Sequence, residues 1–526
     1  MTSPNIVYLD KHSAPRVQFC GDTLIEVDLP VGTRCIYPKP PLEGIKDLDA
    51  AIRYAITHPH GSEPLYAKLR PGMKVLIAID DISMPLPPMR TPDVREKVLT
   101  VVLEMLADYG VEDIEMVIAL AYHRRLSEAE VERMVGKRIF DKYWPDRLYN
   151  HDAEDEANMV VIGETSEGEE VQLNRAAAEA DLVVYVNLNF VPMNGGHKSV
   201  GVGLCGGKTL AAHHNPYTLR KTKSYMEPAE SHIQTIIDRI GEVVNEKLDI
   251  FHIETTINNR MFDSNLDFLG KNPDEYTTRE RLSLKAVLFA LDKCPAGLRE
   301  EIFTRYPAPY GVTGVFAGAT EPTHARSVAK CYEQYCVQVD GQADIQITGI
   351  PYISPYNVHA FLNPVLVQVM AQGYMHNLHR GKPLLKKGGT LIITHPCSDR
   401  FDHDQHASYV EFFHKILPQT GGDAMQLHKR FEKEFSSNPA YIRMYRTGTA
   451  YHPNHPFYMW YWGEAGRQWQ GRCIVVGADN EYVPKMLGYE TAPNMTEAIR
   501  MAKETAPRDP QITSINFAPI IMTEMK

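Results

Sequence analysis

The strongest constraint on the fold is an alternation of short apolar runs with helix-like stretches in the first part of the chain. Met73–Ile79 (MKVLIAI) and Ile114–Leu120 are apolar runs of the length of buried strands. Between them, Thr91–Asp108 has apolar residues at helical spacing behind a Thr-Pro start. Leu182–Asn187 is a third predicted strand. Strands that alternate with helices in this way are typical of a parallel α/β sheet.

The second half of the chain predicts another unit of the same kind. Helical stretches at Gly297–Tyr306 and His324–Val339 precede a predicted strand at Asp344–Ile350. A long predicted helix around Phe361–Leu378 leads to the strand Thr390–Thr394. A chain of 526 residues is also too long for one hydrophobic core, since single cores stop growing near ~250–300 residues.

We therefore expect two α/β domains with mainly parallel sheets and an active site in the cleft between them. Residues 1–280 are predicted to form the N-terminal domain with the cofactor site, and residues 281–490 a C-terminal domain that contributes substrate contacts. We expect residues 491–526 to return to the N-terminal domain. The polar stretch Lys271–Arg281 is the predicted linker.

Composition excludes several classes of protein. A net charge of −11 argues against a nucleic-acid partner, which would require a basic surface. The sequence has no run of ~18 apolar residues that would span a membrane, and its start lacks the pattern of a signal peptide. The eight cysteines show no CxxC pairing and are interpreted as reduced thiols. These features predict a cytoplasmic protein.

Polar residues with chemical potential follow each predicted strand of the first unit. Asp80 and Asp81 come directly after the first strand, His123 follows the second, and the loop that carries Lys198 follows the third. In parallel α/β sheets, ligands bind beyond the carboxyl ends of the strands. We therefore expect these side chains to share one pocket. An unperturbed histidine titrates near ~6.5, so His123 is a candidate general base.

The segment MNGGHKSVGVGLCGGKTLAAHHNP is the most informative stretch for function. Its glycines precede Lys198, and His214 stands sixteen residues further on. An amine can bond to a cofactor, and a neutral imidazole ligates nickel, zinc, copper or iron alike. Gly201–Gly206 also matches the dinucleotide fingerprint GxGxxG, although the predicted strand ends too early for a Rossmann turn.

Two further clusters leave alternatives open. The polar run Asp399–His406 offers carboxylates and imidazoles for a divalent ion, or is simply solvated. His452 and His455 have HxxH spacing between prolines and are interpreted as residues that line the cleft. They belong to the aromatic segment His452–Trp462, which is predicted to pack between the domains or line the cleft.

In order and spacing, these motifs resemble the lactate racemase family, which uses a nickel-pincer nucleotide. Asp81–Pro85 is similar to that family's acidic DxTRP loop, and Ala121–Arg124 to its GTHR turn. Gly195–Lys198 matches its Gly-Gly-x-Lys loop, and the interval to His214 matches that of its nickel ligand. Further on, Cys397–Asp399 matches a CSD turn, and the resemblance extends over most of the chain from about residue 70.

The resemblance implies an isomerase that racemises or 2-epimerises a hydroxy acid. It implies nickel bound by His214, a nickel-pincer nucleotide bonded to Lys198, and catalytic roles for His123 and Asp81. The remaining residues expected around the cofactor are Asp80, Asp81, Gly195, Gly196 and His197. The implied partners are a small hydroxy-acid substrate and the proteins that make the cofactor.

The sequence departs from the family pattern at several positions. Met84 stands in place of the loop arginine, for which we expect Arg90 to substitute, and Leu188 stands in place of a second catalytic histidine. His359 and Asn363 occupy the positions of the family's substrate-binding residues. These changes predict a substrate larger than lactate or differently charged. The alternatives are an NAD-dependent dehydrogenase that uses Gly201–Gly206, and a nickel-nucleotide binding protein without turnover.

Overall fold

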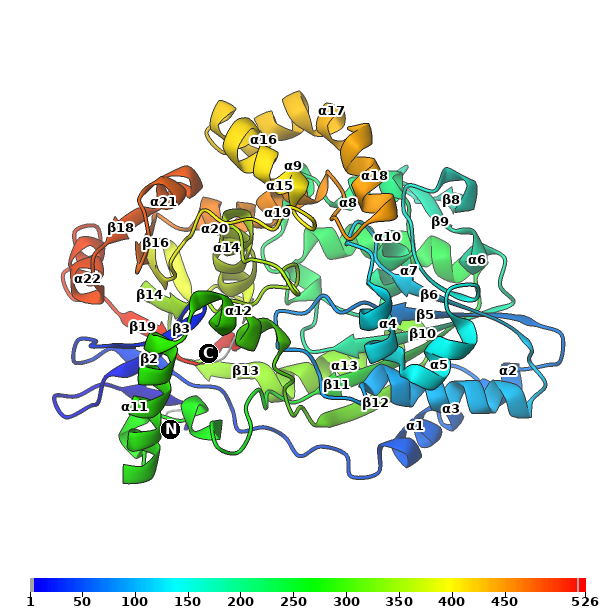
Figure 1. The fold of residues 1–526 in the computed structure, drawn as a ribbon, viewed down its shortest axis with the longest axis horizontal. Coiled ribbons are helices and arrows are strands. Elements are labelled where there is room, and N and C mark those ends of the chain that lie inside the picture. Colours follow the sequence, from blue (N-terminus) through cyan, green and yellow to red (C-terminus); the bar gives the residue numbers. More distant parts are fainter. Residues whose placement is uncertain (1–3, 518–519) are drawn as a thin grey trace.

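The computed structural model describes residues 4–517 and 520–526 and contains two α/β lobes (Figure 1). The first lobe is built on a six-stranded sheet of order β12-β11-β10-β5-β6-β7, in which only β12 runs antiparallel to its neighbour. Its strands are β5 (Lys74–Asp80), β6 (Asp113–Ala119), β7 (Leu148–Asn150), β10 (Leu182–Asn189), β11 (Ile250–Ile257) and β12 (Val312–Gly318). The three strands expected from the sequence are confirmed as β5, β6 and β10.

The second lobe is built on a seven-stranded sheet, which is parallel except at its β1 edge. Its strand order is β1 (Ile6–Tyr8), β4 (Arg34–Ile36), β19 (Ile512–Ile515), β14 (Ala343–Gly349), β16 (Leu385–Thr394), β17 (Arg472–Val476) and β18 (Glu490–Ala492). The two mainly parallel sheets confirm the predicted fold class. The predicted strands at Asp344–Ile350 and Thr390–Thr394 are confirmed as β14 and β16.

The strand pairing crosses the expected domain limits. β1 and β4 lie in the seven-stranded sheet although they precede residue 280, and β12 joins the six-stranded sheet although it follows that residue. The strand β19, which lies within residues 491–526, pairs with β4 and β14 of the seven-stranded sheet and so does not return to the N-terminal lobe as expected. The chain thus passes between the lobes several times. No local sequence signal reports this, because strand partners far apart in sequence are chosen by tertiary packing.

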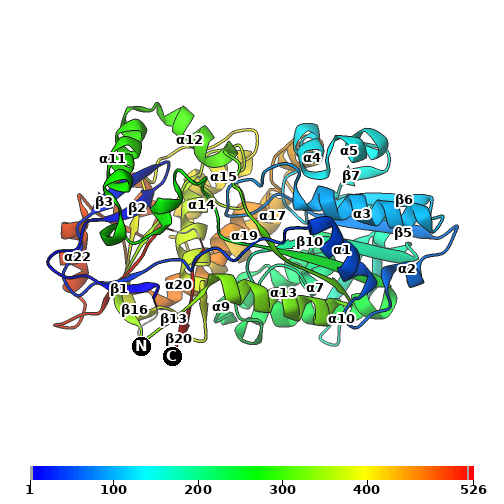
Figure 2. The same ribbon diagram turned by 90° about the horizontal axis from the view of Figure 1, so that it is seen from below.

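Helices cover both faces of the six-stranded sheet, as the view from below shows (Figure 2). They are α1 (Leu48–Thr57), α3 (Val94–Asp108), α4 (Glu128–Val135), α5 (Lys137–Tyr143), α7 (His197–Gly203), α8 (Gly207–His213), α9 (Pro216–Lys221), α10 (His232–Lys247) and α13 (Thr320–Tyr335). α3 is capped by Asp93 and not by the expected Thr91, because the Asp93 side chain accepts from the Arg95 amide. A capping box formed by Ser127 and Glu130 starts α4.

The predicted linker does not divide the lobes. Residues 271–281 contain a short 3-10 turn (Pro273–Glu275) and the start of α11 (Thr278–Lys293). α12 (Ala296–Arg305) follows before the chain returns to β12 and α13 of the first lobe.

The second lobe contributes an irregular helix and a buried aromatic helix toward the first lobe. The long helix predicted around Phe361–Leu378 is α14 (Pro364–Gln368), a π-helical turn over Val369–Tyr374 and a 3-10 turn. Such π-turns are frequent at functional sites. The aromatic segment forms α19 (His455–Trp462), in which every residue is buried.

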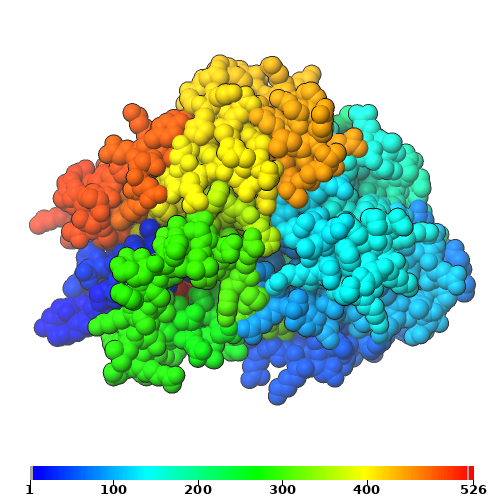
Figure 3. Space-filling model, in the orientation of Figure 1, coloured from blue at the N-terminus to red at the C-terminus, as the bar shows by residue number. Residues whose placement is uncertain are grey.

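A group of short helices lies above both lobes, drawn in yellow and orange at the top of Figures 1 and 3. They are α15 (Ala407–Glu411), α16 (Ala424–Leu427), α17 (Lys433–Ser436) and α18 (Pro439–Thr447). Orange residues meet cyan residues of the first lobe in the space-filling view (Figure 3). There the Tyr445 hydroxyl donates to the Ala121 carbonyl at 3.1 Å, and Arg446 pairs with Asp152 at 2.8 Å. None of the described helices combines the length and apolar character that a bilayer span would need.

Candidate active site

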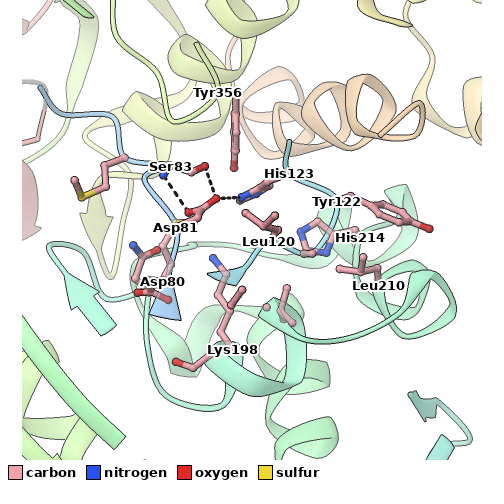
Figure 4. A pocket seen from close by; sticks show the side chains of 18 of the residues that line it. Asp80, Asp81, Ser83, Leu120, Tyr122, His123, Lys198, Leu210, His214 and Tyr356 are labelled. Atoms are coloured by element: carbon pink, nitrogen blue, oxygen red, sulfur yellow. Dashed lines mark hydrogen bonds and ion pairs between the residues drawn. The ribbon is translucent and has the colours of Figure 1, made fainter. Parts of the chain in front are cut away.

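A cavity of about 130 Å³ lies at the carboxyl ends of β5, β6 and β10, where both lobes meet. The first lobe contributes Asp80, Asp81, His123, Lys198 and His214 to its wall, and the second contributes Tyr356, Tyr374, His455, Tyr458 and Trp462. Figure 4 shows Lys198 and His214 on two sides of the same space, next to the paired side chains of Asp81 and His123. Asp80, Asp81, His123 and Lys198, which were expected to share one pocket at this sheet edge, therefore do so. Other residues expected at the site lie elsewhere, as described below.

Lys198 enters the cavity from the first turn of α7, behind a Gly-Gly turn. Gly195 and Gly196 have φ values of 86° and 60°, a backbone region that side-chain-bearing residues rarely adopt. A Cβ at Gly195 would lie 2.7 Å from a Glu254 oxygen and 2.5 Å from the Asn189 amide nitrogen. The two glycines are thus required both for the turn and for its close approach to β10 and β11.

Glu254 on β11 fixes this Gly-Gly turn through hydrogen bonds. Its fully buried carboxylate accepts the Gly196 amide at 2.8 Å, the Asn189 side-chain amide at 2.6 Å and the Ser327 hydroxyl. His324 on α13 adds an ion pair at 3.1 Å. Burial acts to raise the pKa of Glu254, but the charge and hydrogen bond of His324, with the Ser327 hydrogen bond, bring it below its usual value. The carboxylate is therefore charged and fixes the start of α7.

The Lys198 amine has an altered acidity. Burial lowers its pKa to about 8, and the negative charges of Asp80 and Asp81 limit that shift. A far larger fraction of this amine is neutral at neutral pH than in an exposed lysine. Only the neutral amine is a nucleophile or a metal ligand.

The two aspartates at the end of β5 have different environments. Asp80 accepts from the Tyr185 hydroxyl at 3.1 Å and from the Asn187 side-chain amide at 2.8 Å, yet burial raises its pKa to about 6. For Asp81, burial is outweighed by the charge and hydrogen bond of His123 and by the Ser83 hydrogen bonds, so its pKa is lowered. Asp81 is thus the permanently charged carboxylate of the pair.

His123 is oriented by Asp81. Its Nδ1 lies 2.8 Å from Asp81 Oδ2, which leaves Nε2 available for a ligand. A tight turn after β6 places the ring: the His123 amide donates to the Leu120 carbonyl at 2.7 Å, and Ala121 has φ 51°. A carboxylate on one imidazole nitrogen fixes the tautomer and stabilises the imidazolium that forms when the other nitrogen accepts a proton.

His214 has the arrangement of a metal ligand whose second nitrogen is already engaged. It caps the end of α8, and its Nδ1 lies 2.6 Å from Nδ1 of His213. Its ring stacks on Tyr458 with centroids 5.2 Å apart. Burial, with the nearby His213 and Lys198, lowers the pKa of His214 well below its usual value. A neutral imidazole oriented through its other nitrogen is the form that ligates metals.

Four residues expected at the site lie elsewhere. Arg90 is half exposed and paired with Asp263, and His197 faces away from the cavity to pair with Glu321 at 2.9 Å. His359 lines a neighbouring cavity of about 600 Å³, with its Nε2 3.7 Å from Glu130. Asn363 is buried as the N-cap of α14, where it accepts from the Val365 and Leu366 amides. The expected catalytic role of Arg90, the cofactor contact of His197 and the substrate contacts of His359 and Asn363 are therefore not supported by their positions.

The Gly201–Gly206 motif does not form a dinucleotide turn. Gly201 and Gly203 lie inside the helix α7, which begins at His197, whereas β10 ends at Asn189. A Rossmann turn requires the glycines between the strand end and the helix start, so that backbone amides face a pyrophosphate. Here Gly203 instead allows close packing, since a Cβ would lie 2.9 Å from the Tyr185 hydroxyl.

The aromatic wall of the cavity includes residues that belong to no sequence motif. Tyr356 and Tyr374 come from a loop and a π-turn that carry no motif, whereas Tyr458 and Trp462 belong to the aromatic segment expected to line the cleft. That expectation for the segment is confirmed. In the described part of the chain, no group of three or more His, Cys, Asp or Glu side chains is arranged to hold a metal ion, Asp399–His406 included.

Comparison with known proteins places these residues in a recognised domain. Residues 20–227 match the family model described as the lactate racemase N-terminal domain. Lactate racemase of Lactiplantibacillus plantarum is 25% identical over 178 residues, which are 33% of this chain and 40% of that protein. Lactate racemase of Thermoanaerobacterium thermosaccharolyticum is 23% identical over 181 residues, 32% of this chain and 39% of that protein. The matches thus span about two fifths of the length of these curated relatives.

Solved structures share the whole fold. The lactate racemase apoprotein from Thermoanaerobacterium thermosaccharolyticum aligns over 97% of this chain and 100% of its own, with a TM-score of 0.61 and 17% identity. A protein from Thermotoga maritima aligns over 92% of this chain and 100% of its own, with a TM-score of 0.52 and 14% identity.

Residues 20–227, which match the lactate racemase N-terminal domain, include Asp80, Asp81, His123, Lys198 and His214. The chain is similar to lactate racemases over this part of its length.

Proposed function

We propose that the protein is a nickel-pincer-nucleotide-dependent racemase or 2-epimerase of a 2-hydroxy acid. The single observation that carries this proposal is the position of Lys198 and His214, which line one cavity together with the Asp81–His123 pair. An amine, a neutral imidazole and an oriented base within one small pocket match what a tethered metal nucleotide and a proton transfer require.

The residues present fit such a cofactor. The Lys198 amine would bond to it, and the Gly195 turn, which has no side chain, would let backbone approach it closely. His214 would ligate nickel through Nε2, since His213 engages Nδ1. Because the described residues offer no cluster of three metal donors, nickel at His214 would take most of its other donors from the nucleotide. When bound, this cofactor supplies a hydride acceptor and donor.

The chain itself supplies the proton transfer. His123 Nε2 would accept the hydroxyl proton of the substrate, and Asp81 would stabilise the resulting imidazolium through its 2.8 Å contact with Nδ1. Proton removal leaves the oxygen electrons to form a carbonyl as hydride departs from carbon. Transfer back to the opposite face of this planar 2-oxo acid inverts the centre.

The substrate is proposed to differ from lactate. Lys198 is the sole lysine or arginine among the cavity-lining residues of the described chain, so no second cation is available there to hold a carboxylate. The aromatic wall of Tyr356, Tyr374 and Trp462 favours a substrate with a larger side chain. The proteins that build and insert the cofactor are proposed as partners.

Mass spectrometry of the intact protein, together with metal analysis, tests the cofactor proposal. After co-expression with a cofactor-making pathway, we expect an adduct on the Lys198 peptide and about one nickel per chain. A panel of hydroxy-acid enantiomers then tests turnover. Absence of adduct and nickel would reject the cofactor, whereas a loaded protein that is inactive on the whole panel would indicate a binding protein without turnover.

A further inference from the structure

We propose that His455 is a second catalytic base, which accepts the hydroxyl proton of one substrate enantiomer while His123 accepts that of the other. This proposal rests on the proposed racemase function. It is carried by an imidazole nitrogen of His455 that has no hydrogen-bond partner among the described residues, in a ring that lines the same cavity as His123.

Stereochemistry creates the need for a second base. A cofactor held by Lys198 and His214 would accept and return hydride at one position, so both enantiomers would direct their C–H bond toward it. If both enantiomers also place their carboxylate at the same point, their hydroxyl groups lie at different points. General-base catalysis requires a hydrogen-bond distance of about 2.6–3.2 Å, so one rigidly held ring does not reach both hydroxyls.

The other carboxylates, amine and imidazoles that line the cavity are already engaged or assigned. Asp81 orients His123, and Asp80 accepts from Tyr185, Asn187 and the Leu188 amide. Lys198 and His214 are assigned to the cofactor. The lining tyrosines stay protonated and so do not accept the substrate proton, because burial holds the pKa of their hydroxyl groups above the usual value. His455 is the remaining imidazole.

The position of His455 suits this role. Its ring is 2% exposed and lies edge-on to the His123 ring, with centroids 5.6 Å apart. Tyr356 and Tyr451 pack against it at 4.7 and 4.5 Å between centroids and fix its orientation. It comes from α19 of the second lobe, whereas His123 comes from the end of β6. The two imidazoles therefore approach the cavity from different lobes.

A hydrogen bond to Tyr409 sets which nitrogen of the His455 ring carries the proton. The Tyr409 hydroxyl is paired with Nδ1, and Nε2 is the nitrogen without a partner. When Nδ1–H donates to the Tyr409 oxygen, Nε2 keeps its lone pair and can accept a proton. Burial and the neighbouring His123 lower the pKa of His455 well below its usual value, which keeps this ring neutral before substrate binds.

The proposed step is balanced with the cofactor named above. The hydroxyl proton moves to His455 Nε2, the O–H electron pair forms the carbonyl bond, and hydride leaves carbon for the nickel-pincer nucleotide. In the reverse transfer, hydride would return to carbon and protonated His123 would donate the hydroxyl proton, so one enantiomer becomes the other. Proton exchange with solvent would then remove the proton from His455 and restore the one on His123.

The test compares His455→Gln and His123→Gln in the cofactor-loaded protein. We expect both variants to keep the Lys198 adduct and nickel while racemisation falls at least ~100-fold. Each should still release one equivalent of 2-oxo acid, trapped with phenylhydrazine, from a single enantiomer, and the two variants should use opposite enantiomers. The matched control is His452→Gln, since His452 is also buried but bonds to Glu154 at 3.0 Å and does not line the cavity.

Racemisation by His455→Gln within threefold of the unmodified protein would overturn the proposal, as would use of the same enantiomer by both variants. If the unmodified protein releases no 2-oxo acid and racemises nothing, the proposed function itself has failed, and this proposal with it. These two failures are distinguishable because the second appears before any substitution is made.

A binding measurement on the unmodified protein, which needs no turnover, tests the proposal even if a variant does not fold. 2-Hydroxy-2-methylpropanoate has no hydrogen on its reacting carbon and so binds without reacting. We expect it to shift the ¹⁵N resonances of both His123 and His455 in loaded, ¹⁵N-histidine-labelled protein. A shift of the His123 resonance with none for His455 would exclude contact at His455 and reject the proposal.

Discussion

The two walls of the cavity are built by different chemistry. The wall from the six-stranded sheet carries two carboxylates, an amine and two imidazoles, each fixed at a strand end or helix end. The wall from the second lobe is mainly aromatic, and its tyrosines and Trp462 come from a loop, a π-turn and α19. The first wall carries residues that match lactate racemase motifs, and the second does not. Under the proposed function, the first wall, called the cofactor wall, would hold the cofactor, and the second would contact the substrate.

Removal of the Lys198 amine tests the cofactor wall and should have the largest effect. In Lys198→Ala we expect at least a ~1000-fold loss of activity, because the group that would hold the nucleotide is gone. The adduct and bound nickel should disappear from mass and metal analysis of the protein. Lys208→Ala is the matched control, since Lys208 is exposed on α8 and pairs with Glu170. Full nickel loading of Lys198→Ala would contradict the assignment.

His123→Ala separates chemistry from cofactor binding on the same wall. Loss of a general base typically lowers the rate about 10²–10⁴-fold. We expect turnover to fall by that amount while the Lys198 adduct and nickel stay at the level of the unmodified protein. Unchanged activity would remove His123 from the mechanism.

Glu254→Gln tests whether the buried carboxylate supports the Gly-Gly turn. Loss of a charged acceptor for the Gly196 amide and His324 should cost about 2 kcal/mol of unfolding free energy, measured by urea denaturation. Because the pKa of Glu254 is lowered on folding, its contribution is present above the unfolded-state pKa and is lost as pH falls through the folded-state pKa. The difference in unfolding free energy between the unmodified protein and Glu254→Gln should therefore decrease as the pH falls.

The control for this substitution is Glu321→Gln, since Glu321 is 63% exposed, forms a surface ion pair with His197 and accepts a long hydrogen bond from Asn245. A difference that stays constant with pH would show that Glu254 acts through packing and not through its charge.

The pKa of Lys198 predicts a pH-dependent reactivity on the cofactor wall. Because only the neutral amine reacts, acetylation of Lys198 by acetic anhydride in the cofactor-free protein, corrected for hydrolysis of the reagent, should rise about tenfold between pH 7 and pH 9 and level off above the pKa of about 8. Peptide mass spectrometry reads the modified fraction. A rate that continues to climb beyond pH 10, as for an ordinary lysine, would show that burial does not depress this pKa.

Arg90→Ala should have the smallest effect, because its half-exposed ion pair with Asp263 lies outside both walls. Surface pairs of this kind contribute about 0–1 kcal/mol. We expect unchanged nickel loading and activity within twofold of the unmodified protein. A large loss of activity would place Arg90 at the site after all, through a movement of its loop.

The sequence by itself determined the strands β5, β6 and β10 and the residues that follow them. Apolar runs report burial, and parallel strands bring their carboxyl ends to one edge, so Asp81, His123 and Lys198 were predicted to meet. The aromatic composition of His452–Trp462 likewise indicated a buried segment at the cleft.

Only the tertiary structure decided which residues complete the site. Arg90 pairs with Asp263, and His359 lines a neighbouring cavity, so neither side chain lies in the site where the sequence placed it. The pairing of β4 with β19 and the approach of His455 to His123 join segments far apart in the chain. Sequence periodicity reports which face of an element is buried. It does not report which distant element covers that face, because that choice depends on packing summed over the whole fold.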